Sequence, residues 1–336
     1  MADAANGRPT IKVLVENDSN LGPVFAIDPE RIAAAKARHS DVAAHISVAY
    51  SKDCDRFADE IADADVLIGW VFPHAELPRR APRLRWVHLT GAGVEHLAPF
   101  DWVPQGVVVT NNRGVHAPKT REFGALAALM IANRMPQIAH QQRNQEWVPV
   151  YSGTVEDLTA GIVGVGQMGG AVASACKDLG MRVLGIRRGA APHDSVDRMW
   201  GMDGLDALLG ESDVVFLCTP LTPQTRGLIG ARQLARMKRG AGLVNIARGA
   251  VVDTEALRAA LTSGQLSGAV LDVFDPEPLP EDSPLWDTPN LIITPHCSSD
   301  DAEAYVPRTL DLVFENLRRL LAGKDLLAVV DPRLGY

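Results

Sequence analysis

Short runs of apolar, β-branched residues alternate along the chain with longer stretches in which apolar residues recur at helical spacing. In the first third, the alanine-rich stretch Pro29–His39 predicts a helix, and the apolar runs predict strands at Ile11–Val15, His45–Ala49, Val66–Gly69, Leu84–Leu89 and Val107–Val109. Apolar runs without alternation are typical of strands that are buried on both faces. The pattern therefore predicts a parallel sheet covered by helices on either side.

A second series of the same kind begins after Trp147. Helices are predicted at Gly170–Leu179 and Thr254–Leu261, and strands at Ala160–Val165, Arg182–Ile186, Val214–Cys218, Gly242–Ile246, Ala269–Val273 and Leu291–Thr294. This β-α-β rhythm is the pattern of a doubly wound α/β domain.

Two longer helices are predicted outside the two series, one from Lys119 to about Gln142 and one from about Asp301 to Leu321. We therefore expect an α/β protein with two doubly wound domains and a cleft between them. Residues 113–299 would form one domain, and residues 1–112 together with 300–336 would form the other. Ligands in such sheets bind outside the carboxyl ends of the strands.

Composition and charge narrow the class of protein. The chain has 336 residues, of which 46% are hydrophobic and 22% charged, as in a folded protein of about two domains. Its net charge of −8, with no long basic run, argues against a nucleic-acid or anionic-membrane partner. No apolar run reaches the ~18 residues that a membrane span requires. Residues 1–10 lack the pattern of a signal peptide, so we expect a cytoplasmic protein.

The four cysteines, at positions 54, 176, 218 and 297, are scattered. None has CxxC spacing and none clusters with histidines, so they predict free thiols in a reducing compartment and no metal site.

The segment Gly164–Gly169 has the pattern GxGxxG between a predicted strand and a predicted helix, which is the context that a dinucleotide site requires. We expect Gly164 to make the tight turn and Gly166 to let the backbone approach the pyrophosphate at the helix N-terminus. Gly169 would let helix and strand pack closely, and Gln167 and Met168 complete the loop. A tight turn without a ligand is the alternative.

The end of the next predicted strand bears on the choice between NAD and NADP. An acidic residue there would bind the ribose 2′-hydroxyl of NAD, but this strand is followed by Arg187 and Arg188. Two guanidinium groups suit a 2′-phosphate, which favours NADP(H), although NAD(H) stays possible. Two solvated arginines at a strand end are the alternative.

Three later segments each carry a charged or titratable residue shortly after a predicted strand. They read LVNIARGAVVD, LDVFDPEPLP and ITPHCS, and they contain Arg248, Glu277 and His296. We expect all three residues at the carboxyl edge of one sheet, facing the nicotinamide.

At this point the sequence resembles the D-isomer-specific 2-hydroxyacid dehydrogenases. The similarity runs from about Asp65 to Asp331, and its ordered motifs are GxGxxG, TPLTPQTRGLIG, NIARG, LDVFDPEPLP and TPH. The segments WVFP and LTGAGVE, the paired arginines and the closing Gly335-Tyr336 are most similar to the NADPH-dependent glyoxylate/hydroxypyruvate reductase branch.

The resemblance implies a role for each residue of the trio. Arg248 would bind the substrate carboxylate and polarise the keto oxygen, His296 would protonate that oxygen, and Glu277 would hold the imidazole. The chemistry agrees, because hydride addition to a ketone builds negative charge on oxygen, which needs a cation and a proton donor.

The resemblance also implies a Rossmann coenzyme domain, a flavodoxin-like substrate domain and a homodimer formed through the coenzyme domains. Its further contacts are backbone N–H groups for the substrate carboxylate from Gly91, Ala92 and Gly93, and cofactor contacts from Thr219, Pro220, Thr225, Ala247 and Asp272. Asp272 would accept from the nicotinamide amide.

Two positions depart from relatives. Trp70 stands where some enzymes with phosphorylated substrates have an arginine, which argues against a second anionic group on the substrate; core packing is an equal alternative. Cys297 follows His296, where relatives often have an aliphatic residue, and we interpret it as an inert buried cysteine.

The function predicted from the sequence is therefore NADPH-dependent reduction of a small 2-keto acid, of the glyoxylate or hydroxypyruvate type, to the D-2-hydroxy acid. A dehydrogenase for bulkier 2-keto acids and a non-enzymatic, dinucleotide-sensing corepressor-like protein are the alternatives. A formate or phosphite dehydrogenase is a further alternative, of which formate is disfavoured, because the formate enzymes have a glutamine in place of Glu277.

Overall fold

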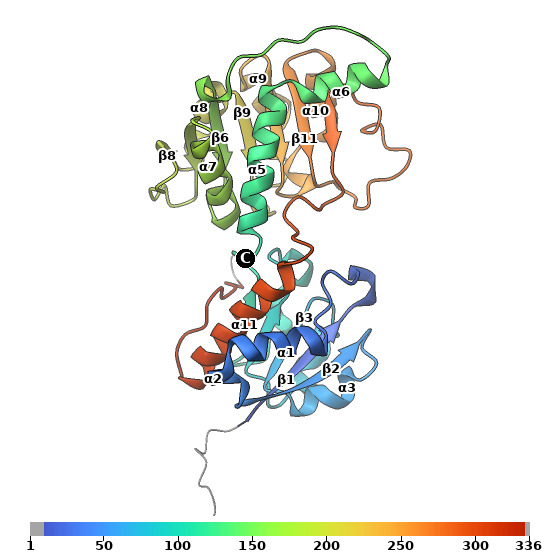
Figure 1. Cartoon of the computed structure of the whole chain (residues 1–336), viewed down its shortest axis with the longest axis vertical. Helices are drawn as coiled ribbons and strands as arrows, with labels where there is room; N and C mark the ends of the chain where they lie inside the picture. Colours follow the sequence, from blue (N-terminus) through green and yellow to red (C-terminus); the bar gives the residue numbers. More distant parts are fainter. Residues whose placement is uncertain (1–9, 333–336) are drawn as a thin grey trace, which may run out of the picture. The chain divides into compact units, whose positions relative to one another are not determined.

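The computed structural model describes residues 10–332 and divides them into two compact units (Figure 1). One unit takes in the described chain up to His116 and again from Asp301, and the other is Ala117–Asp300. The sequence predicted a boundary after residue 112, but Val115 is buried in the core of the first unit. Residues 1–9 and the Gly335-Tyr336 pair lie outside the described residues.

The first unit is built on a five-stranded sheet in the order β2-β1-β3-β4-β5. Its strands, all paired in parallel, are β1 Ile11–Asn17, β2 Ile46–Lys52, β3 Val66–Gly69, β4 Trp86–Leu89 and β5 Val108–Asn111. This is the strand order of the flavodoxin-like folds.

Helices cover both faces of this sheet. Apolar side chains of α1 Pro29–Arg38, α2 Ser40–Ala43 and α11 Tyr305–Leu321 pack with Val13, Val15 and Ile68 on one face. The other face is covered by α3 Phe57–Glu60, α4 Leu77–Arg80 and the loops that follow β4. Helix α1 begins at Pro29 because the Asp28 side chain accepts a hydrogen bond from the Arg31 amide at 2.8 Å, and proline needs no N–H partner there.

The second unit is built on a seven-stranded sheet in the order β12-β11-β10-β9-β6-β7-β8. Its strands are β6 Thr159–Val163, β7 Arg182–Ile186, β8 Arg198–Trp200, β9 Val214–Leu217, β10 Ala241–Asn245, β11 Leu266–Leu271 and β12 Leu291–Ile293. All pairings are parallel, and the order is that of a Rossmann fold with one further strand. The predicted fold class, α/β with two doubly wound sheets, is confirmed.

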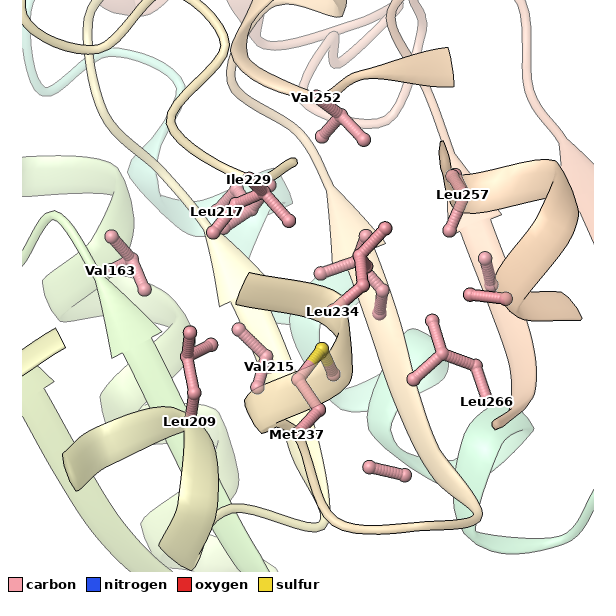
Figure 2. Packing of buried hydrophobic residues seen from close by; sticks show 14 of the residues in the cluster. Val163, Leu209, Val215, Leu217, Ile229, Leu234, Met237, Val252, Leu257 and Leu266 are labelled. Carbon is pink, nitrogen blue, oxygen red and sulfur yellow. The ribbon is translucent and has the colours of Figure 1, made fainter. Parts of the chain in front are cut away.

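Two apolar layers flank the second sheet. On one face, α5 Ala117–Ala132 and α7 Gln167–Asp178 pack on β6, β9 and β10. On the other face, α8 Leu205–Glu211, α9 Ala231–Arg236 and α10 Thr254–Thr262 contribute Leu209, Leu234 and Leu257 to the layer that Figure 2 shows. None of the helices in residues 10–332 is long and apolar enough to cross a membrane.

Two of the helix predictions were wrong in detail. The stretch predicted as one helix, Lys119 to about Gln142, forms α5 and a separate α6, Met135–Arg143. Between them Arg134 takes a left-handed conformation with φ 55°, and Pro136 enters the first turn of α6, where its missing N–H is tolerated. The last helix begins at Tyr305 and not at Asp301, because the Asp301 side chain accepts from the amides of Glu303 and Ala304 and forms a turn. The short elements β8, α8 and α9 were not predicted.

A histidine lies in the apolar core of the first unit. His88, in β4, has no exposed surface, and its ring is 2.9 Å from the Thr110 hydroxyl and 3.0 Å from the Asn112 side-chain oxygen. Burial lowers the pKa of His88 from 6.5 to about 4, because desolvation penalises the charged imidazole more than the bond to Asn112 favours it.

This buried imidazole predicts a loss of stability in acid. The unfolded chain binds the proton near pH 6.5 and the folded chain near pH 4, so the contribution is complete above pH 6.5 and is lost as the pH falls toward 4. The difference is about 3 kcal/mol in the free energy of unfolding. Urea unfolding at pH 7 and pH 4 measures it, and His88→Gln, which cannot titrate, should reduce the pH dependence by that amount. If the free energy of unfolding depended on pH in His88→Gln as it does in the wild type, the lowered pKa of His88 would be contradicted.

Candidate active site

The loop between β6 and α7 has the geometry of a dinucleotide-binding turn. Gly164 has φ 102°, a conformation that favours glycine, and its amide donates to the carbonyl of Ile186 at 2.9 Å. A Cβ on Gly169 would lie 2.1 Å from the carbonyl oxygen of Gly164, so only glycine allows α7 to pack this closely on β6. A Cβ on Gly166 would meet no atom within 4 Å, which leaves its backbone open to a ligand.

This loop lies at the point where the strand order reverses, because β6 pairs with β9 on one side and with β7 on the other. Thr219 follows β9 and touches the turn, since a Cβ on Gly164 would lie 2.9 Å from the Thr219 methyl group. The Thr219 hydroxyl is buried, and it has no hydrogen-bond partner within the described chain. An open glycine and an orphaned hydroxyl beside a helix N-terminus fit a pyrophosphate-containing coenzyme.

The neighbouring residues Pro220 and Thr225 are tied to each other. The Thr225 hydroxyl donates to the Pro220 carbonyl at 2.7 Å and accepts from the Thr222 amide at 2.8 Å. Thr225 therefore holds the turn after β9 in shape.

The two arginines follow the end of β7 directly, and Arg188 is exposed to solvent. The Arg187 amide donates to the carbonyl of Trp200, so β8 fixes the backbone from which the Arg187 side chain extends. No acidic residue occurs between the end of β7 and Asp194.

Glu277 and His296 contact each other directly. The Glu277 Oε2 atom lies 2.7 Å from His296 Nδ1, while Oε1 accepts from the Phe274 amide at 2.7 Å. The carboxylate is thus held on one oxygen and faces the imidazole with the other. Because Nδ1 donates to the carboxylate, Nε2 is the ring nitrogen left for exchange with a substrate. About half of the His296 side chain is exposed, at 49%.

Asp272, at the end of β11, holds the loop that carries His296. Its backbone carbonyl accepts from the His296 amide at 2.9 Å. Its carboxylate accepts from the Thr294 hydroxyl at 2.6 Å, the Cys297 amide at 3.0 Å and the Ser298 hydroxyl at 2.6 Å. These bonds hold His296 at φ 49°, a left-handed conformation that is costly for a residue with a Cβ.

Arg248 lies beside this assembly. Its neighbour Gly249 packs so closely on the next loop that a Cβ would fall 2.0 Å from the Phe274 carbonyl carbon. The Asn245 side chain at the end of β10 spans the turn, because Nδ2 donates to the Arg248 carbonyl and Oδ1 accepts from the Ala247 amide, both at 3.0 Å. The guanidinium donates to the Ala247 carbonyl at 2.7 Å. Chain segments that carry Arg248, Glu277 and His296 therefore meet at one edge of the sheet.

The prediction that Cys297 is buried was wrong, because the residue is exposed. Its amide is tied to Asp272, while Ser298 provides the hydroxyl that turns inward onto the same carboxylate. Partial burial, together with the charges of Asp272 and Asp300, raises the pKa of the Cys297 thiol, so the residue is exposed but poorly ionised.

The remaining predicted site residues belong to the first unit. Gly91, Ala92 and Gly93 follow β4 and are partly exposed. Trp70 follows β3 and lies across this loop: a Cβ on Gly91 would be 2.2 Å from the indole, whose ring centroid is 4.3 Å from that of His96.

Sequence reasoning missed three supporting groups. The Phe274 amide, the Asp272 carboxylate as a loop anchor and the orphaned Thr219 hydroxyl depend on contacts across the fold. A partial signal exists for Asp272, because it is an acidic residue directly after the apolar run Gly268–Leu271.

Comparison with known proteins identifies the family. Residues 125–298 match the family model of the D-isomer specific 2-hydroxyacid dehydrogenase NAD binding domain, and this range lies within the second unit. A glyoxylate reductase from Korarchaeum cryptofilum (strain OPF8) is 36% identical over 284 residues, which is 81% of either chain. The chain belongs to the D-isomer specific 2-hydroxyacid dehydrogenase family.

Solved structures agree with this assignment. The crystal structure of a D-isomer specific 2-hydroxyacid dehydrogenase from Xanthobacter autotrophicus Py2, in complex with NADPH and MES, is 33% identical. It has a TM-score of 0.83 and covers 96% of this chain and 99% of its own. An NADPH-dependent glyoxylate/hydroxypyruvate reductase from Sinorhizobium meliloti, in complex with NADP and sulfate, is 27% identical, with a TM-score of 0.79 and coverage of 97% and 100%. The chain is therefore an oxidoreductase that acts on CH–OH donors, and its resemblance to the glyoxylate/hydroxypyruvate reductase branch is supported.

Proposed function

We propose that this chain catalyses the NADPH-dependent reduction of a small 2-keto acid, of the glyoxylate or hydroxypyruvate type, to the D-2-hydroxy acid. The observation that carries the proposal is the 2.7 Å contact between His296 Nδ1 and Glu277, on the loop next to Arg248.

Each residue of the trio has a separate part in the reaction. The Arg248 guanidinium binds the substrate carboxylate and polarises the keto oxygen, where negative charge grows as the carbonyl is reduced. His296 gives its Nε2 proton to that oxygen, and Glu277 stabilises the protonated imidazole through Nδ1. The keto carbon gains a hydride and its oxygen gains a proton, which yields the hydroxy acid.

The second unit provides the coenzyme site. The reduced nicotinamide, when bound, supplies the hydride. The Gly164–Gly169 turn binds the pyrophosphate, the Thr219 hydroxyl donates to the coenzyme, and the backbone of Ala247 contacts the nicotinamide riboside. Arg187 and Arg188 bind the 2′-phosphate, which makes NADP(H) the preferred coenzyme. The Asp272 carboxylate, besides anchoring the histidine loop, accepts from the nicotinamide amide.

The first unit contributes backbone groups to substrate binding. The amides of Gly91, Ala92 and Gly93 bind the substrate carboxylate. Trp70 limits the size of the pocket, because its indole lies directly against Gly91. The indole carries no positive charge, so this position offers no cation to a second anionic group on the substrate.

The active protein is a cytoplasmic homodimer formed through the coenzyme units. Trp147 and Tyr151, in the segment between α6 and β6, are 97% and 90% exposed, and Trp286 is 44% exposed. Aromatic side chains this exposed on one unit need a partner surface, and a second copy supplies it.

The proposal is tested by a substrate and coenzyme panel. Glyoxylate, hydroxypyruvate, pyruvate and phenylpyruvate are each assayed with NADPH and with NADH, and the chirality of the glycerate formed from hydroxypyruvate is determined. We expect the highest kcat/KM for glyoxylate or hydroxypyruvate with NADPH, and D-glycerate as the product. Preference for phenylpyruvate would replace the substrate assignment, and no reduction of any keto acid would overturn the proposal.

Arg248→Lys separates binding from catalysis at this position. Lysine keeps the charge but loses the planar fork, so the variant should raise the KM for the keto acid and also lower kcat, because polarisation of the carbonyl is strongest in the transition state. We expect a combined loss in kcat/KM of about 100-fold, the equivalent of one bidentate charged contact. Steady-state kinetics measure it, and the NADPH affinity, titrated by fluorescence, should stay unchanged. A variant that kept both constants would make Arg248 a structural residue.

A further inference from the structure

A chain of buried hydrogen bonds runs through the first unit from β4 to α11. Trp86 Nε1 donates to the Thr110 hydroxyl at 2.7 Å, and Thr110 contacts His88 Nδ1 at 2.9 Å. His88 Nε2 lies 3.0 Å from Asn112 Oδ1, and Asn112 Nδ2 donates at 2.7 Å to the Thr90 carbonyl and to the Thr309 hydroxyl. Trp86, His88, Thr110, Asn112 and Thr309 are each at least 99% buried.

The direction of these hydrogen bonds is fixed from the Thr90 end. The Thr90 carbonyl can only accept, so Asn112 turns its nitrogen to Thr90 and its oxygen to His88. That oxygen needs a donor, so the neutral imidazole of His88 has its proton on Nε2, and its Nδ1 accepts from the Thr110 hydroxyl.

Besides α11, this chain of hydrogen bonds reaches the loop after β4. The carbonyl groups of Thr90, Gly91 and Ala92 accept from Asn112 Nδ2, the Asn112 amide and Asn111 Nδ2, at 2.7, 3.0 and 2.7 Å. The Tyr305 hydroxyl also donates to the Thr90 carbonyl. For the amides of Gly91, Ala92 and Gly93, no hydrogen bond to another described residue is found. The carbonyls of Thr90, Gly91 and Ala92 are thus held by hydrogen bonds, and the N–H groups of Gly91, Ala92 and Gly93 remain available to a ligand.

We propose that His88 and Asn112 are positioning residues that hold the Thr90–Gly93 loop with its N–H groups turned toward the substrate carboxylate. Successive backbone N–H groups form an anion site only when their peptide planes are fixed together, and the carbonyl bonds to Asn111 and Asn112 fix them. His88 supports this orientation of Asn112, because the Nε2 proton binds the amide oxygen and leaves the amide nitrogen for the Thr90 carbonyl. The role in substrate binding rests on the proposed function, whereas the fixed conformation of the loop is independent of it.

Two substitutions of His88 distinguish the contact at Nδ1 from the contact at Nε2. The amide oxygen of asparagine reaches the place of Nδ1, so His88→Asn keeps the Thr110 contact and loses Asn112. The longer glutamine reaches the place of Nε2, so His88→Gln keeps a donor for Asn112. In His88→Asn we expect the KM for the keto acid to rise about tenfold, the value of one hydrogen bond, with kcat changed less than threefold and NADPH affinity unchanged. His88→Gln should restore the KM to within threefold of the wild-type value.

The split between these variants distinguishes positioning from general destabilisation. Equal rises in KM for both variants, or no rise in either, would overturn the role. Hydrogen exchange of the peptide that covers residues 88–97 gives a second comparison, since the loop should exchange faster in His88→Asn than in His88→Gln. This measurement needs no substrate, so it decides the loop assignment even if the wild-type protein reduces no keto acid.

The wild-type protein provides a test that needs no variant. In a spectrum of protein labelled with nitrogen-15 in its histidine rings, His88 should be neutral with its proton on Nε2 at pH 6. A proton on Nδ1, or a charged ring at that pH, would overturn the proposed direction of the bonds and the role drawn from it.

Discussion

His296→Ala is expected to lower kcat for keto-acid reduction by about 100- to 10,000-fold, because a positioned proton donor contributes that much to such a reaction. NADPH affinity should change little, since the pyrophosphate site that we propose is on the separate turn after β6. Pre-steady-state absorbance at 340 nm and a fluorescence titration of NADPH measure the two quantities. A variant with wild-type kcat would remove His296 from the mechanism.

Glu277→Gln tests the partner of this histidine. The glutamine keeps the size of the side chain but removes the charge that stabilises the protonated imidazole through its 2.7 Å contact with Nδ1. Reduction needs the protonated form, so the rate should begin to fall at a lower pH than in the wild type. Glu281→Gln, which removes an exposed carboxylate from the same loop, is the matched control and should leave the profile in place. If both variants give the wild-type profile, Glu277 has no part in proton transfer.

The second large effect is expected for the coenzyme. Replacing Arg187 and Arg188 together with acidic residues should raise the KM for NADPH by about 100-fold or more while sparing NADH, because each charge-assisted contact to phosphate contributes about 1.5–3 kcal/mol. Steady-state kinetics with both coenzymes at saturating keto acid provide the measurement.

Arg182→Glu is the control for charge alone. Arg182 lies at the other end of β7, where it pairs with Glu211 at 3.0 Å, so its reversal changes the net charge of the unit without touching the strand end. It should leave the preference between the coenzymes unchanged. A wild-type protein that preferred NADH tenfold would contradict the assignment of the two arginines.

Several features of the molecule could be predicted from local sequence. The continuous apolar runs locate strands such as β3 and β7 to the residue, because a strand buried on both faces has no room for polar side chains. The turn at Gly164–Gly169 was predictable for a similar reason: a left-handed backbone and a 2.1 Å approach leave only glycine. The motifs around Arg248, Glu277 and His296 could be found because each is a short, contiguous segment.

Other features depend on residues that are distant in sequence, and no local pattern contains them. Pro136, next to the break between α5 and α6, can be read from the sequence. Its packing on Gly268 of β11 is visible only in the fold. Cys297 is exposed because of a turn that Asp272 stabilises. The Asp272 carboxylate, 25 residues earlier in the chain, accepts from the Cys297 amide.

The sequence by itself thus determined which strands are buried, where the glycine-rich turn lies and which side chains are candidates for the chemistry, because each of these depends on the size, polarity or backbone freedom of neighbouring residues. The tertiary structure decided how those side chains are held. Glu277 meets His296 because β11 and β12 pair in parallel, and the Thr90–Gly93 loop is fixed because β4, β5 and α11 bring His88, Asn112 and Thr309 together. Hydrogen bonds act over about 3 Å in space whatever the separation along the chain, so only the folded arrangement selects their partners.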